Sequence, residues 1–127
     1  MTRSEEIRSR LMETDVDRRR QFLRELARDA SEDVMRTLGQ ALIQSNWPVC
    51  DEIADTLAEI GGDRARDSLL AALAGRRHHV RSAAIKALAR LRGAGIREAI
   101  EGLRSDPSYE VRQDVSAALQ ELGAESQ

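Results

Sequence analysis

The chain is poor in the residues that build disulfides, β-sheet cores and membrane spans. Its 127 residues include one cysteine, two prolines, one tryptophan, one tyrosine and one phenylalanine. Because aromatic residues are scarce while alanine and leucine abound, closely packed helices are favoured over a β-sandwich or barrel. The single Cys50 excludes an internal disulfide. No apolar run resembles a signal peptide or a membrane span, so we expect a cytoplasmic protein without membrane contact.

Charge is plentiful but balanced. The chain has 20 basic and 22 acidic residues, for a net charge of −2 at pH 7. Two short basic clusters, Arg18 to Arg20 and Arg76 to Arg81, are the segments that can touch phosphate. Acidic residues are interspersed with both clusters. Weak nucleic-acid binding is therefore only a third hypothesis for the function, and we expect no nucleic-acid partner.

One repeat dominates the apolar pattern, with a period of about 31 residues, a length typical of helical-hairpin repeats. Val49, Val80 and Val111 are evenly spaced at this period. The same spacing relates three further apolar sets, and a glycine ends each block: Ile53, Ala84 and Val115; Leu57, Leu88 and Leu119; Ile60, Leu91 and Leu122; and then Gly61, Gly93 and Gly123. Such hairpins bury their apolar stripes by stacking on one another. The sequence predicts an all-α solenoid of antiparallel helix pairs.

The period divides the chain into three regular pairs and a less regular start. We predict repeats at 31–62, 63–93 and 94–127, and either Ser31 or Asp33 can cap the first helix of these by accepting from its free N–H groups. Residues 1–30 are predicted to form a degenerate helical pair that caps the array; the alternative is a separate partner-binding helix. Arg18 stands where this pair would need the ladder valine, although Phe22 and Leu26 do fall on ladder positions.

Two segments, Val80 to Gly93 and Asp106 to Gly123, resemble short HEAT repeats of the phycobilisome-lyase-like kind. The likeness lies in the Asp106-Pro107 turn, the Val-Arg pair that opens each second helix, and the Ala-rich helix that follows. The resemblance implies a right-handed HEAT-like superhelix whose second helices line the concave side. It is specific for a fold that occurs in scaffolds, adaptors and regulatory subunits as well as in bilin-attachment proteins.

The side of each second helix that faces away from the ladder is a candidate partner-binding strip. At 100° per residue the strip contains three groups: Asp51, Ala54, Asp55, Ala58 and Glu59; Ser82, Ile85, Lys86, Ala89 and Arg90; and Gln113, Ser116, Ala117 and Gln120. Its charge changes from acidic to basic to neutral along the stack. The competing interpretation is that neighbouring helices simply pair these opposite charges across repeats.

A column of rings also follows the period, just before each second helix. Trp47, His78 and Tyr109 occupy equivalent positions in successive repeats. We expect them to pack over the turns; the alternative is an edge that holds a peptide, since Trp and Tyr are enriched in binding hot spots. Arg81 and Arg112 are expected to bridge neighbouring repeats. Cys50 occupies the equivalent position, where we expect it to interrupt this arginine ladder as a free thiol, buried or half-buried.

The sequence contains no recognisable catalytic or metal-binding set. His78 and His79 are the only histidines, and adjacent positions on a helix diverge by about 100°, so we predict that they do not share a metal ion. The His-Glu dyads that characterise iron-binding HEAT hydroxylases are absent. A Ser-His-Asp set and a Gly-rich phosphate loop are absent too. We therefore expect no cofactor and no enzymatic activity.

These observations favour a protein-interaction scaffold or regulatory adaptor, without enzymatic activity, that binds another protein along the concave face. We expect a monomer or a weak homodimer. The alternative hypothesis is that the groove holds a small molecule such as a tetrapyrrole, in a lyase-like or chaperone-like role.

Overall fold

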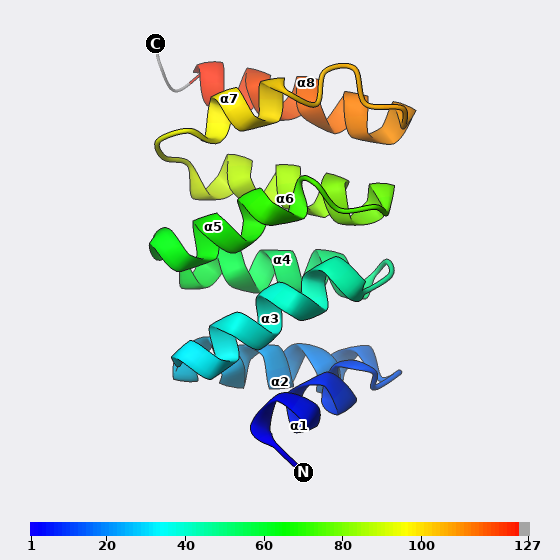
Figure 1. Cartoon of the computed structure of the whole chain (residues 1–127), viewed down its shortest axis with the longest axis vertical. Coiled ribbons are helices and arrows are strands. Elements are labelled where there is room, and N and C mark those ends of the chain that lie inside the picture. The colour runs from blue at the N-terminus through cyan, green and yellow to red at the C-terminus, as the bar shows by residue number, and fades with distance from the viewer. Residues whose placement is uncertain (125–127) are drawn as a thin grey trace.

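Eight helices and no strand make up residues 1–124, the part of the chain that the computed structural model describes. The helices are α1 (Arg3–Leu11), α2 (Val16–Asp29), α3 (Glu32–Gln44), α4 (Val49–Ile60), α5 (Gly62–Ala72), α6 (His78–Leu91), α7 (Ile96–Glu101) and α8 (Tyr109–Ala124). Successive helices form four antiparallel pairs that stack along one axis (Figure 1). The prediction of an all-α solenoid is confirmed.

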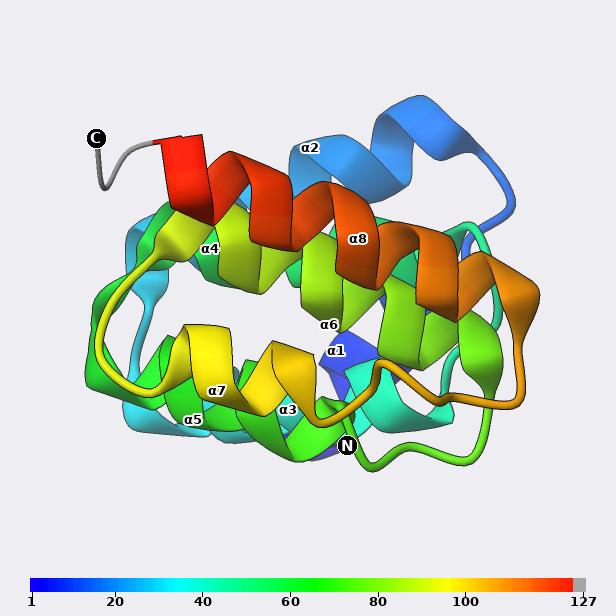
Figure 2. The ribbon, with the colours of Figure 1, turned by 90° about the horizontal axis from the view of Figure 1, so that it is seen from above.

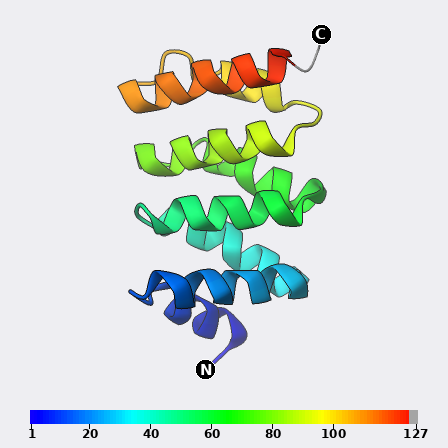
Figure 3. The ribbon, with the colours of Figure 1, turned by 180° about the vertical axis from the view of Figure 1, so that it is seen from behind.

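The pairs place their helices in two layers. Seen along the stack, the first helices α1, α3, α5 and α7 lie in one layer, and the second helices α2, α4, α6 and α8 lie in the other (Figure 2). The four turns within the pairs all lie at one edge, on the right in Figure 1 and on the left in the reverse view of Figure 3. We call this side the turn edge.

Local sequence signals set several helix ends. The Ser31 hydroxyl accepts from the Val34 N–H at 3.4 Å, as predicted, and caps α3. Gly61 ends α4 with φ +71°, a left-handed value that residues with a Cβ rarely adopt. Gly123 does not end the last helix as predicted, because α8 continues through it to Ala124.

Most of the predicted apolar ladder lies in the core, while its outer members are only partly buried and pack against it: Val49, Ile60, Leu91, Leu119 and Leu122. Ile53, Leu57, Val80, Leu88 and Val111 are all fully buried. Phe22 and Leu26 of the first pair join the same cluster, so the core continues from the first pair to the last. Within residues 1–124, no helix combines the length and the apolarity needed to cross a membrane.

The second helices are more enclosed than the sequence interpretation allowed. Besides its own partner α5, α6 packs against α4, α7 and α8. As a result Ala54, Ser82, Ile85 and Ala89, which we predicted to face away from the core, are at most 2% exposed. The prediction is wrong for these residues, because a second helix inside the stack is covered by the second helices on both sides as well as by its own first helix.

Candidate functional site

What remains of the predicted strip is a row of charged and amide side chains. Asp55, Glu59, Lys86 and Arg90 are exposed, Asp51 is half-buried, and Gln113 and Gln120 are exposed on α8. Ser82, also named as a partner-binding residue, lies beneath this surface with 2% exposure. Its buried hydroxyl oxygen has no hydrogen-bond partner within residues 1–124.

Four charges of the strip are paired with each other. Lys86 Nζ lies 3.5 Å from an Asp51 carboxylate oxygen, and Arg90 Nη1 lies 2.7 Å from Asp55 Oδ1. Burial raises the pKa of Asp55 above its usual value, although the Arg90 guanidinium acts in the opposite direction. Most of the charged groups that we assigned to a partner therefore pair with each other between α4 and α6.

The ring column lies on the turn edge and is more open than we expected. Trp47 is 62% exposed and Tyr109 66%, so the prediction that these rings pack over the turns is wrong. Trp47 Nε1 donates to Asp51 Oδ2 at 3.1 Å, and Tyr109 Oη accepts from Gln113 Nε2 at 2.6 Å. Each ring is thus held by the residue four positions later in the chain and still faces solvent.

Arginines at equivalent positions of three second helices donate to carbonyls of the turns, and we call them the arginine ladder. Arg81 Nη1 and Arg112 Nη1 each donate to the carbonyl oxygen six residues earlier, at Gly75 (2.9 Å) and Asp106 (2.6 Å). Arg19 Nη1 does the same to the Glu13 carbonyl at 2.6 Å. Sequence reasoning missed Arg19, although it lies one period before Cys50 and two before Arg81, because the search for the ladder valine stopped at its neighbour.

Two of these arginines also bind a carboxylate of the next pair. Arg81 Nε and Nη2 donate to the two Asp106 oxygens at 2.8 and 3.0 Å, and the Asp106 side chain is only 3% exposed. The Arg81 guanidinium holds the pKa of Asp106 below its usual value. Arg19 makes the equivalent two-pronged pair with Glu52, which raises the pKa of Arg19. The predicted bridging role of Arg81 is confirmed.

At Cys50 the ladder is continued by another residue. Cys50 is fully buried, and this burial raises the pKa of its thiol, as expected for an unreactive core cysteine. The Gln44 carbonyl, six residues before Cys50, still receives a donor, because Arg77 Nη1 of the next pair lies 2.6 Å away.

A pocket of about 310 Å³ opens beside Trp47 at the turn edge. Most of its walls are apolar, and no carboxylate is among its lining residues, which are Arg8, Leu11, Met12, Ala41, Gln44, Ser45, Asn46, Trp47 and Val49. No periodic pattern indicated this pocket, because its walls come from three helices and two turns of the first two pairs.

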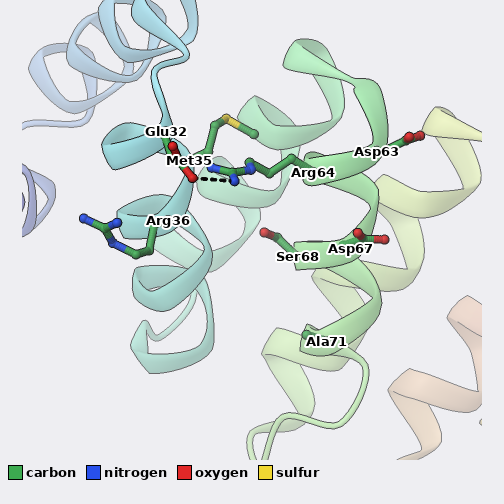
Figure 4. Close-up of a pocket in the computed structure, with 8 residues that line it drawn as sticks. All are labelled: Glu32, Met35, Arg36, Asp63, Arg64, Asp67, Ser68 and Ala71. Atoms are coloured by element: carbon green, nitrogen blue, oxygen red, sulfur yellow. Dashed lines mark hydrogen bonds and ion pairs between the residues drawn. The ribbon is translucent and has the colours of Figure 1, made fainter.

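A wider hollow of about 620 Å³ lies between α3 and α5 in the first-helix layer. Figure 4 shows its charged rim, where Arg64 donates to Glu32 at 2.9 Å. Two further rim residues, Arg36 and Asp63, pair with Asp33 and Arg66. Because these charges are paired and solvated, the hollow has no polar group that converges on a ligand.

His78 and His79 meet Glu110 at the same edge. Their ring centroids are 4.0 Å apart, so the premise that the two side chains diverge is wrong. His78 is the first residue of α6, so no preceding helical turn keeps its ring away from the ring of His79. Glu110 is the periodic counterpart of His79, and this relation was the signal that could have placed the three side chains together.

A sequence model described as HEAT repeats matches residues 4–89, which is more than half of the chain. The chain belongs to the HEAT-repeat family. The match includes the first helical pair, which we predicted to be a degenerate cap. The narrower likeness to phycobilisome-lyase-like repeats stays a prediction. No curated protein sequence matches the chain.

The fold is similar to that of human deoxyhypusine hydroxylase, solved in complex with glycerol. The TM-score is 0.71 at 21% sequence identity, and the match covers 95% of this chain and 43% of the hydroxylase chain. This array of helices therefore occurs inside an enzyme, and our prediction that the chain has no enzymatic activity is contradicted. At this identity the likeness shows the fold alone, and the chain spans less than half of the hydroxylase.

Proposed function

We propose that the chain binds another protein through its turn edge, with Trp47 as the central contact. The observation that carries this proposal is the 62% exposure of Trp47 next to a largely apolar pocket. Trp is the side chain most typical of binding hot spots, and such residues cluster around pockets that a partner can fill.

The surroundings of Trp47 form a connected apolar surface. Met12, in the turn of the first pair, is 79% exposed and lines the same pocket, as does the buried Leu11 behind it. Two large apolar residues exposed around one hollow are more than the scattered single residues that ordinary surfaces show. An apolar side chain of a partner can enter between them.

The charge around the pocket indicates the chemistry of the partner. Arg8 lines the pocket. Arg77 donates to the carbonyl of Gln44, which is another lining residue. With the Arg8 guanidinium in the lining, the Arg77 guanidinium beside a lining residue and no carboxylate in the lining, the site complements a segment that carries an aromatic or aliphatic anchor flanked by acidic residues. The volume of about 310 Å³ lies at the lower end for ligand pockets, which favours one side chain over a tetrapyrrole.

The second-helix strip is a weaker candidate. A partner that used Lys86 or Arg90 would have to replace the ion pairs that these residues make with Asp51 and Asp55. Such exchange gains little, since exposed ion pairs contribute roughly 0–1 kcal/mol. The turn edge needs no such exchange.

The test selects peptides with an apolar anchor and acidic flanks from a displayed library against the immobilised chain. Trp47 is the only tryptophan, so its fluorescence reports directly whether a selected peptide covers the ring. We expect its emission to move to shorter wavelength. We also expect Trp47→Ala to weaken binding, measured by calorimetry, at least about tenfold, as for a hot-spot residue.

The matched control is Tyr109→Ala, which removes a comparably exposed ring from the other end of the same edge. This variant should bind the selected peptides as the unchanged chain does. If Trp47→Ala keeps full affinity, or if both variants lose affinity equally, the proposed site is wrong.

A further inference from the structure

Three metal-ligating side chains converge where the third and fourth helical pairs meet at the turn edge. His78 and His79 come from the first turn of α6, and Glu110 comes from the first turn of α8. One donor atom of each lies within 4.8 Å of the other two. Their side chains are 46%, 41% and 52% exposed, so an ion can reach them from solvent.

The distances fit a shared ion. His78 Nε2 lies 3.5 Å and His79 Nδ1 lies 3.8 Å from the same Glu110 oxygen, Oε2. In a tetrahedral zinc site with bonds of about 2.0–2.2 Å, neighbouring donor atoms are roughly 3.4 Å apart. The Glu110 oxygen is therefore within a few tenths of an ångström of this spacing from each nitrogen. One donor atom of each residue lies within 4.8 Å of the others, and exposed side chains can close the remaining distance by rotation.

We propose that His78, His79 and Glu110 bind one divalent transition-metal ion of the Zn²⁺ class. Three protein ligands leave one position of a tetrahedral ion open to water or to another ligand, which is the arrangement of reactive rather than purely structural zinc sites. The proposal does not depend on the Trp47 pocket, which is formed by the first two pairs.

The ligands and the local charge define which ions bind. A single carboxylate cannot satisfy Ca²⁺ or Mg²⁺, which require several oxygen ligands. The positive N-terminal end of α6 and the neighbouring Arg76 and Arg77 disfavour a cation that binds by charge alone. Imidazole nitrogens bind Zn²⁺, Ni²⁺ and Cu²⁺ through directional bonds, so these ions are the ones that the site selects.

Such an ion would join two pairs of the solenoid. His78 and His79 belong to the third pair and Glu110 to the fourth, so the bound ion adds a connection between α6 and α8. An ion that binds only the folded chain raises its melting temperature as the ion concentration rises. Zn²⁺ is therefore expected to stabilise the chain as well as to bind it.

The experiment uses the full chain without an affinity tag, freed of metal by a chelator. Zn²⁺ alone is titrated at pH 7.5 by calorimetry, and the melting temperature is followed in parallel. We expect one Zn²⁺ per chain and a higher melting temperature. Glu110→Gln and His79→Gln should each weaken binding by roughly tenfold or more, since even residues outside the ligand set commonly contribute that much.

Three controls separate this site from other sources of binding. Glu98→Gln removes an exposed carboxylate elsewhere on the fourth pair and should bind Zn²⁺ normally. Cys50→Ser should also bind normally, because Cys50 is fully buried in another pair. Mg²⁺ should produce neither heat nor stabilisation.

Two results would overturn the proposal. One is the absence of saturable Zn²⁺ binding by the unchanged chain. The other is equal Zn²⁺ affinity in the unchanged chain, Glu110→Gln and His79→Gln, which would show that the cluster is only a contact between two imidazole rings and a carboxylate. Because all three side chains are exposed, the variants should fold, and circular dichroism verifies this.

Discussion

The turns that precede α4 and α6 each present a carbonyl that receives a guanidinium donor, but the donor comes from a different place in each case. Arg81, in the first turn of α6, reaches back to the Gly75 carbonyl and also binds Asp106. The equivalent residue of α4 is Cys50, and Arg77 from the next pair donates to the Gln44 carbonyl instead.

In both turns a carbonyl receives a guanidinium donor, although the arginine that supplies it occupies a different sequence position. A carbonyl that is shielded from water and has no donor costs free energy. In each turn, an arginine that lies within reach supplies that donor. The two solutions are not equivalent, however. The Arg81 side chain also holds a buried carboxylate, whereas the Arg77 side chain, within residues 1–124, is held by the carbonyl contact alone.

The largest expected effect comes from breaking the core that both turns share. Leu88→Asp would bury a carboxylate without a partner at a position with 0% exposure. We expect the free energy of unfolding to fall by more than about 4 kcal/mol. Urea denaturation followed by circular dichroism measures this, and a variant that unfolds at the same urea concentration would show that the ladder is misinterpreted.

The second largest effect is expected from removing Arg81, which holds the turn before α6. Arg81→Ala would leave the Asp106 carboxylate, 3% exposed, without its ion pair, and we expect a loss of about 3 kcal/mol. Arg112→Ala removes a donor to the Asp106 carbonyl and should cost about 1 kcal/mol. Equal losses in urea denaturation would refute the distinction between an ion pair and a carbonyl contact.

The same ion pair predicts a dependence on pH. The pKa of Asp106 is lower in the folded chain than in the unfolded one, so its contribution is complete above the unfolded value of about 3.9 and is lost as pH falls below it. The stability difference between the unchanged chain and Arg81→Ala should therefore shrink between pH 5 and the acid limit of folding, in parallel urea titrations at each pH. A constant difference would contradict this assignment.

Removing Arg77, the donor to the turn before α4, should have a smaller effect on stability. Arg77→Ala leaves the Gln44 carbonyl without its guanidinium, and we expect a loss of about 1 kcal/mol. Arg76→Ala removes an adjacent exposed arginine side chain and should change stability by less than about 0.5 kcal/mol. Thermal denaturation of both variants gives the comparison. Identical melting temperatures would mean that Arg77 does not replace the missing ladder residue.

The smallest effect is expected on the strip of the second helices. Arg90→Ala removes an exposed ion pair with Asp55 and should cost about 0.2–1 kcal/mol, less at high salt. It should leave the affinity for peptides selected at the turn edge unchanged in calorimetry. A tenfold loss of affinity would return the binding surface to the strip.

The 31-residue period predicted the buried side of each second helix but not how much of its opposite side is covered. Val80 and Leu88 were placed correctly because the regular spacing determines which side of a helix faces the stack. Ser82 and Ile85 were misplaced because one periodic stripe describes contact with one layer, whereas a second helix inside the stack is covered on three sides.

The turn edge could be predicted only in part. The ring column and Glu110 follow from the period, but the exposure of Trp47 and the leaning of His78 toward His79 depend on turn geometry that spacing does not encode. Arg77 supplies the donor that is missing at Cys50 through a contact between two helical pairs. The repeat pattern describes residues within one pair, so it does not predict this contact.

Hydrogen exchange of the chain with a selected peptide bound tests most directly whether the turn edge is the binding surface. Protection is expected in residues 8–13 and 41–50, which surround the Trp47 pocket, while the α8 segment 113–120 exchanges as in the free chain. Protection confined to 82–90 and 113–120, with no change around Trp47, would contradict the account.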